Sequence, residues 1–151
     1  MITMRALVVG LTLALTATAV PAGAATPFKV VAHPDVPALS ISKATLAQIF
    51  LRTRPRWDGG EKTKPVDQVA SSPAKVAFVR IILDRDLDAL KAYWEQQVFA
   101  GKGVPPPEKP DDAAVVAYVA ATPGAVGYIS ASTRVEGLKV LEVTGLGGAD
   151  K

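Results

Sequence analysis

The residues with the clearest chemical potential are Ser71, Ser72 and Lys75, which surround the start of an expected helix. Ser72 stands at an N-cap position and Pro73 at the first helical position. The hydroxyl can therefore accept from an orphan backbone N–H, and the proline ring presets φ. The start of a buried helix offers free N–H donors and the positive end of the helix dipole, which favour anions. These residues predict either a small-oxyanion site or an ordinary capped helix.

Two elements must position this turn. A short strand around Val66 leads into it, and an apolar helix leaves it and runs to about Leu83. The helix is apolar on nearly every side, so we expect it to be buried in a core. Its apolar residues are Val76, Ala77, Phe78, Val79, Ile81, Ile82 and Leu83.

The first 24 residues are typical of a secretory signal peptide. Arg5 provides a positive start, an apolar run extends over residues 6–20, and Ala22 and Ala24 flank a small-x-small cleavage site. We expect cleavage after Ala24 and a single domain over residues 25–151, located in the periplasm or secreted. The apolar run is short for a membrane span, and we expect no span once the signal is removed.

Charge and composition limit the classes of function. The 151 residues include 17 lysines and arginines against 14 acidic residues, a net charge of +3. This excess is too small to predict nucleic-acid binding, although it suits a protein that meets small anions. No cysteine is present, so disulfides and cysteine metal sites are excluded. His33 is the only histidine and cannot form a typical zinc site alone.

Periodicity and caps predict the remaining elements. Strands are expected at residues 28–32, 125–130 and 138–143, and a stiff loop at residues 101–110. Ser42 is expected to cap a helix over residues 43–51. The expected inward residues of that helix are Leu46, Ile49 and Phe50.

Two further helices are expected. One spans residues 86–99, and the other begins at Asp111 or Asp112 and ends near Ala121. Alternating strands and helices indicate an α/β fold. The expected inward residues are Leu87, Leu90, Trp94 and Val98 in the first of these helices and Val116 and Val119 in the second.

The run from Ile49 to Phe78 resembles the substrate-binding proteins of phosphate ABC transporters. It contains the pair Ile49-Phe50, a turn with Trp57 and Gly60, a strand around Val66, and a serine turn that opens a helix with Ala77-Phe78. Similar motifs follow at Tyr93-Trp94, at residues 99–103 and at residues 122–129.

The resemblance implies a periplasmic-binding-protein-like (type II) single lobe, with a mixed, partly parallel sheet flanked by helices. It also implies binding of phosphate or a similar oxyanion for ABC-transporter-linked uptake. The residues expected at the site are Gln68, Ser71, Ser72 and Lys75.

Three departures from the family leave an alternative open. Gln68 stands where longer relatives often carry arginine, which would supply a bidentate charged fork. Pro73 removes one backbone donor at the helix start. The chain also has the length of only about one lobe. It could therefore be a non-catalytic envelope interaction module that docks a permease or another envelope protein and has lost small-ligand binding.

Catalysis is not expected. The sequence contains no nucleophile elbow, no metalloprotease helix motif and no P-loop. Asp84, Asp86 and Asp88 resemble part of a calcium loop, but the glycine and the later glutamate that such a loop requires are absent. We expect neither a cofactor nor a metal site. The arginines Arg52, Arg54 and Arg56 fit a solvated loop at a helix end, or a site that meets an anion or a partner.

Overall fold

The computed structural model describes residues 26–147. The predicted signal peptide at residues 1–24 lies outside the described residues, as do residues 148–151. Among the residues described, no helix combines the length and the apolar character needed to cross a membrane.

The central sheet has five strands in the order β2-β7-β1-β6-β3. Strand β1 pairs antiparallel with both β6 and β7, while β2 and β3 add parallel edges. The prediction of a mixed, partly parallel sheet is therefore confirmed. The strands are β1 (Phe28–Ala32), β2 (Ser40–Ser42), β3 (Lys64–Pro65), β6 (Ala125–Ser130) and β7 (Lys139–Thr144).

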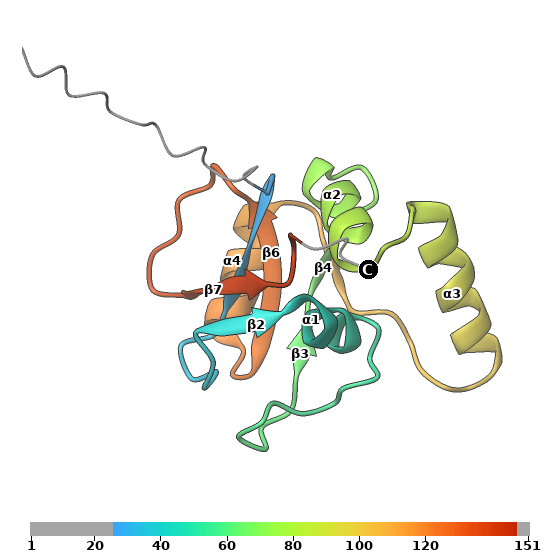
Figure 1. The fold of residues 1–151 in the computed structure, drawn as a ribbon, viewed down its shortest axis with the longest axis horizontal. Helices are drawn as coiled ribbons and strands as arrows, with labels where there is room; N and C mark the ends of the chain where they lie inside the picture. Colours follow the sequence, from blue (N-terminus) through green and yellow to red (C-terminus); the bar gives the residue numbers. More distant parts are fainter. Residues whose placement is uncertain (1–25, 148–151) are drawn as a thin grey trace, which may run out of the picture.

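Helices cover both faces of this sheet (Figure 1). Val30 belongs to the core that contains α1 (Lys43–Phe50) and α2 (Pro73–Ile82), and the adjacent Val31 belongs to the core that contains α4 (Asp112–Ala121). Successive side chains of a strand point to opposite faces, so one apolar strand supplies both cores. In α4 the buried residues are Val115 and Val119. The prediction for Val119 is confirmed, whereas that for Val116 is wrong by one position.

A two-stranded parallel sheet, β4 (Asp67–Gln68) with β5 (Glu108–Lys109), lies beside the start of α2. The prediction that residues 101–110 form only a loop is thus wrong at its end. Residues 108–109 become a strand because β4 provides a partner, which no local pattern reveals.

Helix α3 (Leu87–Phe99) stands apart from the sheet, with α2 between them (Figure 1). Leu90 and Trp94 are buried, as predicted, but Val98 is 52% exposed. The prediction for Val98 is wrong because α3 packs sparsely on the rest of the fold, and only Leu90 and Trp94 of this helix are buried. Helix α2 is also less buried than predicted, since Val76 is 38% exposed.

Gly124 is required by the tight turn before β6. Its φ is +80°, and a Cβ atom there would lie 2.3 Å from the carbonyl oxygen of Lys62. Gly124→Ala should therefore lower the free energy of unfolding by about 2 kcal/mol or more, through backbone strain and overlap with a backbone atom. Chemical denaturation measures this loss.

Gly103→Ala is the matched control, because a Cβ atom at Gly103 meets nothing within 4 Å. It should change the stability by less than about 0.5 kcal/mol. Equal losses for the two variants would contradict the strain assigned to Gly124.

Candidate anion-binding site

The expected turn joins β4 to α2, as predicted. The backbone N–H of Ser72 donates to the carbonyl oxygen of Val69 at 2.9 Å, which closes the turn. Ser72 is the N-cap of α2, and its hydroxyl oxygen accepts from the N–H of Lys75 at 3.4 Å. Ser71 lies at the exposed tip of the turn.

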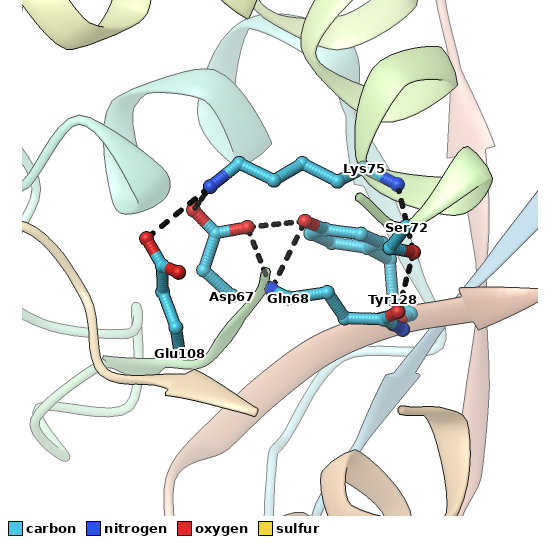
Figure 2. Close-up of polar contacts among 6 residues, drawn as sticks. All are labelled: Asp67, Gln68, Ser72, Lys75, Glu108 and Tyr128. Carbon is cyan, nitrogen blue, oxygen red and sulfur yellow. Dashed lines mark hydrogen bonds and ion pairs between the residues drawn. The ribbon is translucent and has the colours of Figure 1, made fainter. Parts of the chain in front are cut away.

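Gln68 is fully buried and links four elements. Its side-chain N–H₂ donates to Asp112 Oδ1 and to the carbonyl oxygen of Tyr128, both at 2.9 Å. Its amide oxygen accepts from the Ser72 hydroxyl at 2.6 Å. Gln68 therefore holds β4, α2, α4 and β6 together, and its side-chain hydrogen-bonding groups are occupied inside the protein. Figure 2 shows the bond with Ser72.

Lys75 lies in the first turn of α2, but its ammonium group is directed away from Ser72 (Figure 2). The Nζ atom is 3.3 Å from Asp67 Oδ2 and 3.4 Å from Glu108 Oε1. The side chains of Lys75 and Asp67 are only 7% and 9% exposed. The positive charge expected at the turn is thus already paired with two carboxylates, which we call the Asp67–Lys75–Glu108 cluster.

Asp67 is the centre of the buried network. It accepts hydrogen bonds from the N–H of Gln68, at 2.8 Å, and from the hydroxyl of Tyr128. Burial raises the pKa of Tyr128 far above its usual value, and the adjacent Asp67 charge raises it further, so the phenol remains a donor. In the described part of the chain, no buried side-chain nitrogen or oxygen lacks a hydrogen-bond partner.

Asp112, the first residue of α4, is a second carboxylate near the turn. It accepts from the Thr133 hydroxyl at 2.6 Å, from the backbone N–H of Ser130 and from Gln68. Burial opposes ionisation, but these hydrogen bonds together outweigh it and lower the pKa of Asp112. Asp112 is consequently ionised at neutral pH.

Sequence reasoning missed the residues that surround the predicted ones. Asp67 and Asp112 flank Gln68 in space, and Glu108 and Tyr128 complete the network. One local signal existed, namely a charged Asp67 directly after the apolar Val66 in an expected strand that leads into a buried helix. A buried charge generally requires a partner, and Lys75 is the first cation that follows Asp67 in the chain.

Few donors remain for an anion at this turn. The first N–H groups of a helix lack intrahelical acceptors, but Pro73 has no N–H and the N–H of Lys75 is capped by Ser72. The N–H of Ala74 and the hydroxyl of the exposed Ser71 are therefore among the donors left.

Comparison with solved structures decides the fold. The chain matches a putative phosphate ABC transporter substrate-binding protein with bound phosphate from Clostridium perfringens, with a TM-score of 0.63 and 16% identity over 78% of this chain. The chain has a periplasmic-binding-protein fold. Sequence comparison gives no further relative, because no protein-family model and no curated protein matches.

Two other solved structures agree with this fold. An ABC-type phosphate transport receptor from Vibrio cholerae matches with a TM-score of 0.60 and 16% identity, and PstS from Borrelia burgdorferi with 0.61 and 17%. Each match covers 78% of this chain. The resemblance inferred from sequence motifs is thereby confirmed at the level of the fold.

The chain spans less than half the length of the solved structures it matches. The shares of those chains covered are 44% for the Clostridium protein, 46% for the Vibrio protein and 47% for the Borrelia protein.

A cluster of basic side chains lies after α1. A small cavity of about 250 Å³ is lined by Arg52, Arg54, Arg56 and Lys62 together with uncharged residues. Arg54 pairs with Asp58, and Arg56 donates to the carbonyl oxygen of Gly60 at 2.8 Å. This cavity is an alternative to the turn at Ser71 as a candidate anion-binding site.

The remaining candidates for chemistry have structural partners. His33 Nδ1 accepts from the N–H of Asp35 at 3.1 Å. Asp86 caps α3, and Asp84 pairs with Lys43 at 2.8 Å. Within residues 26–147, no group of three or more His, Asp or Glu side chains is arranged to hold a metal ion.

Proposed function

We propose that this chain is a non-catalytic, exported substrate-binding domain that takes up a small oxyanion such as phosphate at the turn from Gln68 to Lys75. The supporting observation is the fold, since all three solved structures above are described as phosphate-transport or phosphate-binding proteins or as PstS. The turn adds local support, because a strand ends and a buried helix begins there.

In this proposal the protein acts in the periplasm and delivers its ligand to an ABC permease. The contacts would come from the Ser71 hydroxyl and the backbone donors at the start of α2. Ser72 and Gln68 would fix the shape of the turn. With Lys75 engaged by two carboxylates, the anion would be held chiefly by neutral donors, and we expect an affinity modest for a transport protein.

An NMR titration with phosphate, and separately with sulfate, tests the proposal. The largest amide shifts are expected at Ser71, Ser72 and Lys75, with calorimetry giving a Kd tighter than about 100 μM, or roughly −5.5 kcal/mol. Ser71→Ala should weaken binding about tenfold, since a hydrogen bond to a charged group contributes about 1.5 kcal/mol or more. Ser71 is exposed, so this substitution leaves the fold intact.

Arg52→Ala is the matched control from the competing basic cavity. It should leave the affinity unchanged. Shifts confined to Arg52, Arg54 and Arg56, together with a larger loss of affinity in Arg52→Ala than in Ser71→Ala, would place the anion at the basic cavity instead.

The second candidate is the non-catalytic envelope interaction module. The pairing of Lys75 with Asp67 and Glu108 favours it, because these contacts remove the nearest cation from the turn. If neither oxyanion moves any amide at millimolar concentration, the oxyanion proposal fails and this module becomes the better description.

A further inference from the structure

A cleft of about 810 Å³ separates α3 from the part of the body that carries β4, β5 and the start of α2. We call it the α3 cleft. Its volume lies within the range of about 300–1,000 Å³ typical of small-molecule sites. Its apolar wall comes from α3 and the loop that follows, and consists of Leu87, Leu90, Trp94, Val98, Phe99 and Pro105.

The charges that line the α3 cleft are mostly negative. Four carboxylates face two ammonium groups. Both cations are already engaged, because Lys75 lies against Asp67 and Glu108 and Lys91 lies 3.8 Å from Glu95. The net charge of the residues that line the cleft is therefore negative. The four acidic residues are Asp67, Asp88, Glu95 and Glu108.

Glu108 is the carboxylate best placed to meet a ligand. Its side chain is 47% exposed, and Oε1 contacts Lys75. Among residues 26–147, the Oε2 atom accepts no hydrogen bond, and Figure 2 shows the contact with Lys75 at the other carboxylate oxygen. A half-exposed carboxylate can attract the charged group of a ligand. The apolar walls beside it can bury an apolar part of the same ligand.

Two of the apolar residues that line the cleft are exposed to solvent. Phe99 is 95% exposed and Val98 is 52% exposed, and both line the cleft. Exposed apolar residues that gather at a concave surface mark a binding site more often than single exposed residues do. Aromatic rings such as those of Phe99 and Trp94 also favour organic cations, because their faces attract positive charge.

We propose that the α3 cleft binds an organic cation with an apolar body, such as an alkyl- or arylammonium compound. The ammonium group would approach Glu108, and the apolar body would lie along Trp94 and Val98. This inference does not depend on the oxyanion proposal, since it concerns a ligand of opposite charge and a different set of residues.

Three probes with the same chain length and different head groups test this inference. Octylammonium, octanol and octanoate are titrated below their aggregation limits at pH 7, where an alkylamine is protonated because its pKa is about 10. Octylammonium should bind about tenfold or more tightly than octanoate, with octanol between them. NMR shifts should centre on the Trp94 indole and on residues 87–105.

Glu108→Gln and Phe99→Ser provide the matched variants. Glu108→Gln should weaken octylammonium about tenfold and leave octanol unchanged, and Phe99→Ser should weaken all three probes. Leu39→Ser is the control, because Leu39 is 76% exposed and does not line the cleft. Octanoate binding as tightly as octylammonium, shifts outside the cleft, or no binding of any probe would overturn the inference.

Discussion

Replacing Lys75 with methionine should lower the free energy of unfolding by about 3–5 kcal/mol. The substitution keeps the length and packing of the side chain but removes its charge. Asp67, whose side chain is 9% exposed, then loses the cation that lies 3.3 Å from it. Removing one partner of a buried ion pair is costly because the other charge remains buried without compensation. Urea denaturation of the purified protein measures the loss.

Lys91→Met is the control for this experiment. Lys91 is 76% exposed in its contact with Glu95, so the same substitution there should cost less than about 1 kcal/mol. The double variant Lys75→Met with Asp67→Asn should recover part of the stability, because it removes both charges together. If Lys75→Met and Lys91→Met are equally stable, the Lys75 ammonium is not buried against Asp67 in solution.

This stability effect decides how the oxyanion proposal must be tested. From the sequence, Lys75→Ala is a cleaner probe of anion binding than Ser72→Ala, because Ser72 is also expected to cap the helix. The structure contradicts that use, since Lys75 is buried and ion-paired. A loss of anion binding in a Lys75 variant would reflect a disturbed fold as readily as a lost contact. Ser71→Ala remains the informative substitution.

Replacing Trp94 with alanine should also lower the free energy of unfolding by about 3–5 kcal/mol, as for a large buried aromatic side chain. Trp94 is 9% exposed and packs edge-on against Tyr93 with ring centroids 5.0 Å apart. Leu90 and Trp94 are the buried residues of α3. Both belong to the hydrophobic core, so the loss of Trp94 removes much of the attachment of α3 to the body. The amides of α3 should therefore also exchange with solvent faster in the variant.

Asp88→Ala is the control on the same helix. Asp88 is exposed in the first turn of α3, where an acidic side chain contributes only about 0.3–1 kcal/mol through the helix dipole. Chemical denaturation together with hydrogen exchange compares the two variants. Similar stabilities and similar exchange rates for α3 would show that Trp94 does not anchor the helix.

The sequence by itself determined the features that depend on neighbouring residues. Ser42, Ser72 and Asp86 were expected at helix starts, and all three are N-caps in the structure. The strands at residues 28–32 and 125–130 were also predicted with their observed bounds. These features are local, since a cap bonds a backbone group three residues away and an apolar strand is bounded by prolines and glycines.

Only the tertiary structure decided what the candidate site residues contact. Gln68 bonds residues 44 and 60 positions away in the chain, and Lys75 meets Glu108 across 33 positions. Lys75 turned inward because Asp67 is buried and a buried carboxylate needs a cation and donors near it. The spacing of Gln68, Ser71, Ser72 and Lys75 placed them at one turn. The strands and the helix that pack around that turn are distant in the sequence. They determine which polar groups of these four residues remain free for a ligand.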